Sequence, residues 1–360
     1  MRKSPRVGIT HGDINGIAGE IILKLTEEEG LSEIFTPVIF STTSDIQRWA
    51  QALGMNPPTG NTIKNSRDII DGRENWVNCS DVAHNISIGN RTEEARQAEE
   101  SALRKALDAW NYENIDLIVS TPGQIGSSVE IGSLSSFDTP EEVVPMTLLI
   151  DGTSRFIQLP AAASEEENAD LLRHRIQEIH NALRADFRLV RPRIAVITPD
   201  ASPLATPLPY VKEGEIDPNV ITPMRQAVLE LQAEGHTLIG PLPMQQVFEQ
   251  EQYAHYDACI VIASQESFDT AVEKVLSENA VYSTIGLPFV HTYPKLEIYL
   301  NAGKNCTSPD QLRNAIYTGI DICRAREDYY RYTHRPLEKQ WVPRGKDDFK
   351  LDLTKEDPTT

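Results

Sequence analysis

The sequence predicts an α/β protein in which helices flank a parallel or mixed sheet. An apolar segment at 6–10 is followed by a glycine-containing turn and by helical spacing of Ile and Leu over 17–25. A long amphipathic segment at 92–110 precedes a short apolar segment at 115–119, and strand, helix, strand in this order is typical of parallel sheets. The length of 360 residues favours two domains, because one domain usually holds about 100–200 residues.

The segment at 92–110 is the clearest helix of the chain. Thr92 stands where a capping hydroxyl is expected, and Glu93 and Glu94 follow where negative charge meets the positive end of the helix dipole. One stripe of apolar side chains recurs every three or four residues and consists of Ala95, Ala98, Ala102, Leu103, Ala106, Leu107 and Trp110. The stripe predicts that this helix packs against the sheet.

The second half of the chain alternates again between strand and helix patterns. Apolar segments at 146–150 and 155–159 flank the turn dipeptide Asp151-Gly152 and predict a hairpin. Further elements are predicted as strands at 193–198 and 257–263 and as helices at 165–185 and 309–330.

Two segments are less regular. Residues 120–142 are rich in Gly, Ser and Thr and are expected to form a long loop at a domain junction. Asp217-Pro218 combines a cap residue with a first-turn proline. It predicts a helix that runs from there to Gly235, with an irregularity at Pro223.

Composition excludes several classes of protein. The formal net charge of −19 disfavours nucleic acid as a partner, because a phosphate backbone repels an acidic surface. No apolar run is long enough for a signal peptide or a membrane span, so we expect a cytoplasmic protein without a membrane partner. The four cysteines form no C-x-x-C pair and suggest neither a zinc site nor a disulfide framework; they are Cys79, Cys259, Cys306 and Cys323.

Polar residues at strand ends are the candidates for ligand contacts. Open α/β sheets bind ligands at the carboxyl ends of their strands, where Ser202 and Ser264 stand. Both serines could instead be polar caps on the strand ends. His11 and His291 also lie where such folds bind ligands, and Gly12-x-x-x-Gly16 could present backbone N–H groups to an anion or simply form a tight turn.

Six short segments follow one another in the order known from a single protein family; they are Arg6–Ile17, Val119–Pro122, Arg191–Val196, Gly235–Pro243, Tyr256-Asp257-Ala258 and Thr284–Phe289. By these segments the chain resembles the NAD-dependent 4-hydroxythreonine-4-phosphate dehydrogenases of pyridoxal phosphate biosynthesis. The resemblance runs in order from residue 6 to about 325.

This resemblance implies a fold similar to isocitrate and isopropylmalate dehydrogenases and a homodimer with a small-molecule ligand between the domains. We expect a discontinuous first domain at 1–134 plus 290–345, a second domain at 135–289, and a mobile charged tail at 346–360. The resemblance also implies NAD as cofactor and a divalent metal held by three histidines, which would polarise the reacting oxygen.

The positions that match the three metal histidines carry other side chains. Ala162 stands in the first position, Ser202 in the second and Ser264 in the third. An alkyl group or a hydroxyl lacks the imidazole nitrogen that the metal requires, so we expect no divalent metal and no confident catalytic residue.

The substrate-binding and cofactor-binding positions that the resemblance implies are partly changed. Asp138 replaces a histidine, Thr139 is retained, and His291 replaces an arginine. A carboxylate at Asp138, with Glu266 and Asp269, would make the site acidic and would repel a substrate phosphate. The implied cofactor-binding residues are Asp13, Asn15, Gly286, Leu287 and Pro288.

Three functional hypotheses follow from these departures. The first is a non-catalytic member of the dehydrogenase family, a pseudoenzyme that binds a ligand or a partner chain. The second is an active NAD-dependent oxidoreductase on a related hydroxy acid, with Mg²⁺ or Mn²⁺ held by Asp13, Asp138, Asp200 and Glu266. The third is a module that keeps NAD without performing chemistry, which the preserved Gly286-Leu287-Pro288 segment leaves open.

Overall fold

The computed structural model describes residues 4–28, 30–125, 128–134, 144–199 and 222–334. The strands are β1 (Arg6–Thr10), β2 (Thr36–Ser41), β3 (Asn61–Ile63), β4 (Asn75–Asn78), β5 (Leu117–Ser120), β6 (Met146–Asp151), β7 (Ser154–Pro160), β8 (Arg193–Thr198), β9 (Thr237–Pro243), β10 (Ala258–Ala263), β11 (Val281–Ile285) and β12 (His291–Pro294). The helices are α1 (Ala18–Thr26), α2 (Leu31–Ile34), α3 (Thr43–Leu53), α4 (Glu93–Asn111), α5 (Ser128–Leu134), α6 (Glu165–Phe187), α7 (Pro223–Ala233), α8 (Met244–Glu249), α9 (Gln265–Glu273) and α10 (Asp310–His334), with short 3₁₀ turns at Ser66–Asp68 and Gln252–His255.

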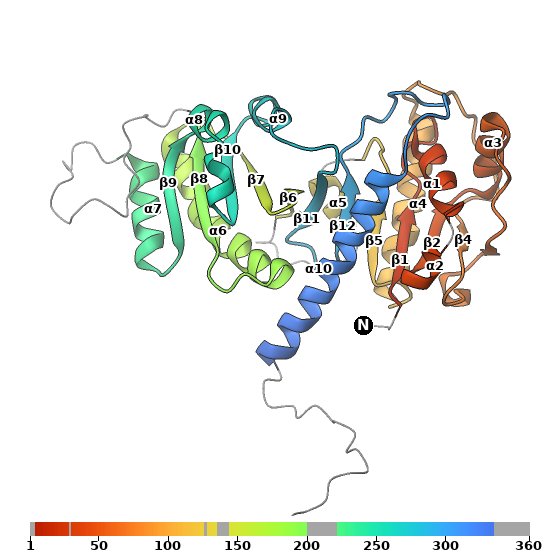
Figure 1. Cartoon of the computed structure of the whole chain (residues 1–360), viewed down its shortest axis with the longest axis horizontal. Coiled ribbons are helices and arrows are strands. Elements are labelled where there is room, and N and C mark those ends of the chain that lie inside the picture. Colours follow the sequence, from red (N-terminus) through yellow and green to blue (C-terminus); the bar gives the residue numbers. More distant parts are fainter. Residues whose placement is uncertain (1–3, 29, 126–127, 135–143, 200–221, 335–360) are drawn as a thin grey trace, which may run out of the picture.

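Within these described ranges, all the strands join one mixed sheet. Their order is β3-β4-β2-β1-β5-β12-β11-β6-β7-β10-β8-β9. The pairs toward both ends of the sheet are parallel, whereas β12–β11, β11–β6 and β6–β7 in the middle are antiparallel. Helices cover both faces along the length of the sheet (Figure 1). The predicted α/β class with a largely parallel sheet flanked by helices is confirmed.

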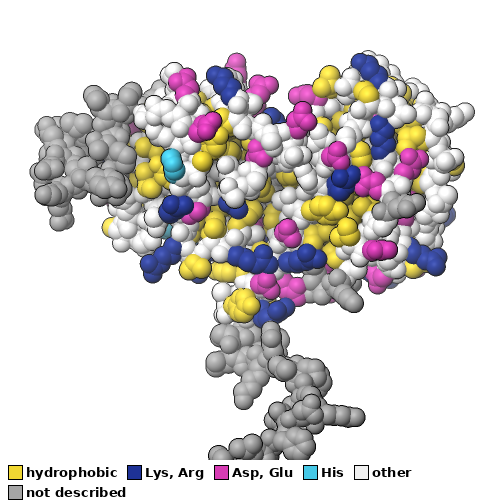
Figure 2. Space-filling model, in the orientation of Figure 1, with side chains coloured by type: hydrophobic (Ala, Val, Ile, Leu, Met, Phe, Trp, Pro, Cys, Tyr) yellow, Lys and Arg dark blue, Asp and Glu magenta, His cyan; other side chains and the backbone are white. Residues whose placement is uncertain are grey.

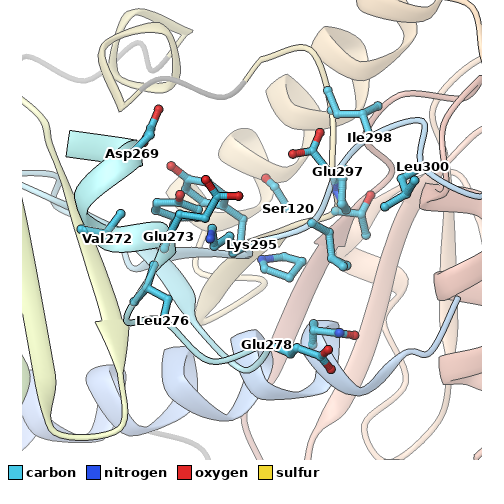
Figure 3. Close-up of a pocket in the computed structure, with 18 of the residues that line it drawn as sticks. Ser120, Asp269, Val272, Glu273, Leu276, Glu278, Lys295, Glu297, Ile298 and Leu300 are labelled. Atoms are coloured by element: carbon cyan, nitrogen blue, oxygen red, sulfur yellow. The ribbon is translucent and has the colours of Figure 1, made fainter. Parts of the chain in front are cut away.

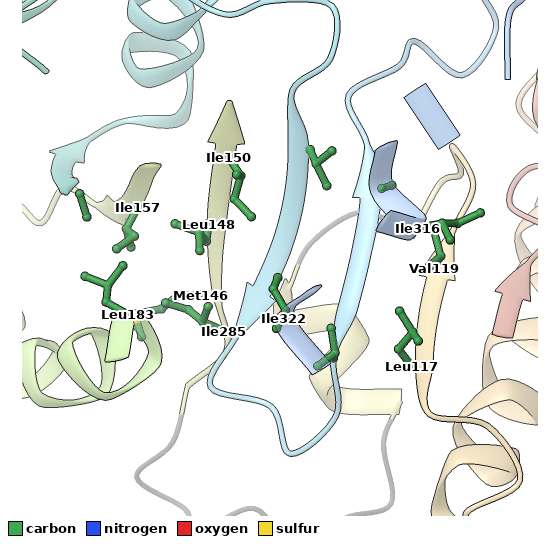
Figure 4. Close-up of a cluster of buried hydrophobic side chains, with 14 of the residues drawn as sticks. Leu117, Val119, Met146, Leu148, Ile150, Ile157, Leu183, Ile285, Ile316 and Ile322 are labelled. Atoms are coloured by element: carbon green, nitrogen blue, oxygen red, sulfur yellow. The ribbon is translucent and has the colours of Figure 1, made fainter. Parts of the chain in front are cut away.

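Alternation along the strands decides which helix packs on which face. On β5, Leu117 and Val119 point to the face covered by α10, while Ile118 points to the face covered by α4, because successive strand residues point to opposite sides. The same rule places Leu148 of β6 in the core with α6 and α10, and Leu149 in the core with α8 and α9. Figure 4 shows the cluster that contains Leu117, Val119 and Leu148, which crosses the centre of the sheet. Each fully buried Leu or Ile there contributes about 1.5–3 kcal/mol by leaving water.

Several local predictions are confirmed. Thr92 caps α4, accepting a hydrogen bond from the Ala95 backbone N–H at 3.2 Å, and the apolar stripe of that helix is buried against the sheet. The hairpin forms as β6 and β7, whose register pairs Asp151 with Ser154 across the predicted turn.

Two local predictions are corrected by the structure. Residues 120–142 are not loop throughout, because α5 begins at Ser128 and ends at Leu134. Pro223 is not an irregularity inside a helix but the first residue of α7, where a proline has no N–H bond to lose; Thr222 caps it. The predicted start at Asp217-Pro218 and the predicted tail at 346–360 lie outside the described residues.

Candidate functional site

A cleft of about 740 Å³ lies where β5 and β12 end and β11 begins. One wall is formed by Ser120–Gly123 and by the segment from His291 to Leu300, and the other by α9 and the chain after it. Figure 2 shows the molecule hollowed at its upper edge between two lobes. Figure 3 shows Asp269 and Glu273 on α9, with Glu273 near Lys295. A cavity of this size suits a small-molecule ligand.

Acidic side chains dominate the lining of the cleft. Asp269, Glu273, Glu278 and Glu297 line it, against one cation, Lys295. Clefts lined by one sign of charge concentrate ligands of the opposite sign and repel those of the same sign. The cleft therefore favours a neutral or cationic group over a phosphate.

His291 lies in this wall and is fully buried. Its Nε2 lies 2.9 Å from Ser120 Oγ, its Nδ1 lies 3.0 Å from Thr284 Oγ1, and Thr10 Oγ1 donates to the same serine oxygen at 3.0 Å. Burial lowers the pKa of His291 to about 3, so the ring is neutral near pH 7. The predicted substrate-binding His291 thus lies at the cleft, but it brings no positive charge to an anion.

Asp13 and Asn15 are buried in the turn after β1 and are engaged by protein partners. Asp13 Oδ1 accepts from the Asn15 backbone N–H at 2.7 Å, while Oδ2 accepts from Gln124 Nε2 at 2.7 Å and from Tyr299 Oη at 2.6 Å. Asn15 Nδ2 donates to Thr92 Oγ1 at 2.9 Å. These two predicted cofactor-binding side chains hold loops together and leave little capacity for a cofactor.

The other predicted cofactor-binding residues lie at the opposite ends of the central strands from Asp13 and Asn15. Gly286 follows the end of β11, which runs antiparallel to β12, so Gly286, Leu287 and Pro288 lie where β12 begins. Asp13 follows the end of β1, beside the end of β5, because Thr10 pairs with Ser120. The structure therefore does not bring the five predicted cofactor-binding residues together.

The positions that match two metal histidines do lie side by side. β7 and β10 are parallel, and the Ala161 backbone N–H donates to the Ala263 carbonyl at 3.3 Å, so Ala162 and Ser264 follow adjacent strand ends. Ser264 caps α9: its Oγ accepts from the Ser267 N–H at 3.3 Å and donates to Ser267 Oγ at 2.9 Å. Ala162 has no donor side chain. Ser202, Asp138 and Thr139 lie outside the described residues.

Neither Ser120 nor the buried Glu99 was predicted from the sequence as a site residue. Glu99 accepts hydrogen bonds from the backbone N–H groups of Gln124 and Ile125 at 2.7 and 3.0 Å, and it holds the loop that lines the cleft. Burial raises its pKa to about 7, against the effect of these two hydrogen bonds. The available signal was a carboxylate between Ala98 and Ala102 on the apolar side of a helix. For Ser120 the available signal was its place directly after the apolar segment 115–119, the kind of position that singled out Ser202 and Ser264.

Neither a metal cluster nor a membrane-spanning helix is found in the described ranges. No group of three or more His, Cys, Asp or Glu there could hold a metal ion. No helix among the described residues has the length and apolar character needed to cross a bilayer.

The fold and the cleft define an α/β protein with a ligand-sized cavity at the carboxyl ends of its central strands. The family described as pyridoxal phosphate biosynthetic protein PdxA matches residues 147–319. A 4-hydroxythreonine-4-phosphate dehydrogenase of Bacteroides thetaiotaomicron is 27% identical, over 97% of this chain and 97% of that protein. A Cutibacterium acnes protein provisionally named D-threonate 4-phosphate dehydrogenase is also 27% identical, over 93% of this chain and 100% of that protein.

A solved structure supports the fold. The 4-hydroxythreonine-4-phosphate dehydrogenase of Klebsiella pneumoniae superposes with a TM-score of 0.62 at 19% identity, covering 89% of this chain and 100% of that one. The chain is thus similar to the PdxA family over residues 147–319 and to these dehydrogenase-named relatives over nearly its whole length. The resemblance seen in the sequence is confirmed.

Proposed function

We propose that this protein, which is similar to the PdxA family, binds a neutral or cationic small molecule in the acidic cleft and has lost metal-dependent dehydrogenase chemistry. The observation that carries the proposal is the pair of strand ends at β7 and β10. There the side chains are the methyl group of Ala162 and the hydroxyl of Ser264, which is engaged as a helix cap.

The donor groups at these positions do not fit a divalent metal. A catalytic metal site needs about three protein ligands with available lone pairs. Ala162 offers none, and withdrawing Ser264 from its cap would leave the Ser267 N–H without that partner. These two positions therefore supply too few ligands for a catalytic metal.

The charge of the cleft supports a change of ligand. The relatives are named for substrates that carry a phosphate. In this chain the α9 wall presents Asp269 and Glu273, Glu297 lies opposite, and His291 is neutral. A phosphate in that cleft would meet repulsion with only Lys295 to offset it.

The placement of the cofactor positions argues against the NAD-binding alternative. The side chains of Asp13 and Asn15 are hydrogen-bonded to protein groups beyond the carboxyl ends of β1 and β5. Gly286–Pro288 lie at the other ends of the central strands, where β12 begins. The residues that the resemblance implies for NAD therefore do not form one cradle. Both carboxylate oxygens of Asp13 accept hydrogen bonds from protein groups. This weighs against the alternative in which Asp13 and other carboxylates hold Mg²⁺ or Mn²⁺.

The proposal includes two domains with the ligand between them, 1–134 plus 290–345 and 135–289. The walls of the cleft support this division, since Ser120–Gly123 and His291–Leu300 belong to the first domain and Asp269–Tyr282 to the second. A homodimer in the cytoplasm, which the family resemblance implies, is part of the same proposal. The mass measured by light scattering after gel filtration tests the dimer.

Turnover is the decisive test of lost chemistry. The purified chain is assayed with NAD, 4-hydroxythreonine 4-phosphate and, in turn, Mg²⁺, Mn²⁺, Zn²⁺ and Co²⁺, and reduction of NAD is followed by absorbance. We expect no NADH formation. Turnover at about 1 per second or faster, an ordinary enzyme rate, would refute the proposal.

Calorimetry tests the ligand class separately. Titration with 1,4-diaminobutane, glycerol and 4-hydroxythreonine 4-phosphate should give the tightest binding for the diamine. The double variant E273Q/E297Q should weaken diamine binding by about tenfold or more, whereas E93Q, an exposed change on α4, should not. Equal diamine affinity in all three proteins would remove the cleft as its site.

A further inference from the structure

A second cavity, of about 180 Å³, lies near the outer end of the sheet. Phe40 of β2 and Val77 of β4 contribute apolar lining, and the segment 64–67 and the side chains of Lys105 and Asp108 on α4 contribute polar lining. It lies in the part of the fold built by β2, β4 and α4 (Figure 1). It shares no lining residue with the acidic cleft.

The charge of this cavity is opposite to that of the whole chain. Lys64, Arg67 and Lys105 line it with one carboxylate, Asp108, in a protein whose formal net charge is −19. Neither Lys64 nor Arg67 forms an ion pair with another residue of the described ranges. Three cations brought together without paired carboxylates repel one another, and an anion bound among them would relieve that repulsion.

Two of the cations are held in place by neutral partners. The Arg67 guanidinium carbon lies 5.6 Å from the centre of the Tyr112 ring, and the Arg67 backbone N–H donates to Asn65 Oδ1 at 3.0 Å. Lys105 Nζ donates to the Asn78 carbonyl at 2.8 Å, which uses one of its three donors. The other N–H groups of the Lys105 ammonium and the Arg67 guanidinium remain available to a ligand. Because these two side chains are already held in place, binding a ligand costs less conformational entropy.

We propose that this basic pocket binds the phosphate group of a small phosphomonoester. A doubly charged oxyanion matches the local excess of positive charge, and its oxygens accept the charge-assisted hydrogen bonds that Arg and Lys donate. The pocket is small beside the 740 Å³ cleft, which suits a phosphate group rather than a whole dinucleotide. The site is independent of the function proposed for the cleft.

Calorimetric titration at low ionic strength tests the pocket, with inorganic phosphate, glycerol 3-phosphate and AMP as probes. The wild type should bind at least one probe saturably in the millimolar range or tighter. The variant K64Q/R67Q should weaken that binding by about tenfold or more. D108N, which removes the one carboxylate of the pocket, should strengthen it. Both changes are at exposed residues, and far-ultraviolet circular dichroism verifies that the variants fold.

A matched variant separates local recognition from net charge. R104Q removes a cation from the same helix as Lys105, but Arg104 is exposed, pairs with Glu100 and does not line the pocket, so its binding should match the wild type. Tighter binding of the two esters than of inorganic phosphate would identify an organic phosphate as the ligand, and equal binding would identify the free ion. The proposal is overturned if no probe binds, or if K64Q/R67Q and R104Q bind like the wild type.

Discussion

His291 on β12 and Ser120 at the end of β5 are joined across 2.9 Å between Nε2 and Oγ, although 171 positions separate them in the sequence. The other ring nitrogen, Nδ1, is hydrogen-bonded to Thr284 Oγ1. Burial lowers the pKa of His291 to about 3. The ring is therefore a neutral anchor that fixes a hydroxyl in the cleft wall. It does not supply the positive charge of the arginine that the family resemblance implies at this position.

The change H291L should lower the free energy of unfolding by about 2–4 kcal/mol. Leucine leaves the half-buried hydroxyl of Ser120 and the buried hydroxyl of Thr284 without that partner, and the loss of a partner to a buried group costs about 1–3 kcal/mol. Urea unfolding at pH 7 measures the loss. The change H174A, at an exposed histidine, should stay within about 0.5 kcal/mol. A loss below about 1 kcal/mol for H291L would contradict the anchoring role.

The same histidine should destabilise the fold in acid. Its pKa is lowered from 6.5 to about 3, so the unfolded chain takes up a proton between these values that the folded chain does not. Stability from this group is complete above pH 6.5 and is lost as the pH falls toward 3. The difference in unfolding free energy between the wild type and H291L should therefore shrink from pH 7 to pH 4. A constant difference would exclude this titration.

Glu99 should act in the opposite direction. Its pKa is raised from 4.5 to about 7, so the folded state keeps a proton that the unfolded chain releases between these values. Its contribution is complete below pH 4.5 and is lost as the pH rises through 7, by about 3 kcal/mol at most. E99Q stays neutral, so its stability relative to the wild type should rise from pH 5 to pH 8. The exposed E93Q on the same helix should show no such trend.

The cap at Ser264 can be separated from a ligand role by substitution. S264A should cost about 1 kcal/mol of unfolding free energy, because the Ser267 N–H loses its side-chain acceptor, and S264D should retain most of the stability. S164A, at the matching cap of α6, should cost a similar amount. If S264A unfolds like the wild type, the hydroxyl is not needed as a cap and is free for another role.

Restoring imidazoles should create metal affinity. The triple variant A162H/S202H/S264H places nitrogen donors at the three positions that match the family's ligands, two of which follow adjacent strand ends. We expect stoichiometric Co²⁺ binding with visible d–d absorption in the variant and none in the wild type. Comparable Co²⁺ binding by the wild type would show that other residues already hold a metal.

Local pattern determined much of this protein from the sequence alone. Thr92 and the alanine stripe behind it specified α4, and Asp151-Gly152 between two apolar runs specified the β6–β7 hairpin. Such features depend on neighbours within a few residues, because caps, turns and helical or strand periodicity are local. The family resemblance likewise required only the order of short motifs along the chain.

The tertiary structure alone decided which residues meet. The order and direction of the strands place Gly286 and Asp13 at opposite ends of the central strands, although both belong to the same predicted site. Register brought Ser120 to His291, and packing buried Glu99 beneath the loop that lines the cleft. These outcomes depend on contacts between distant segments, so the charge, tautomer and hydrogen-bonding capacity of each side chain are set by neighbours that no local pattern specifies.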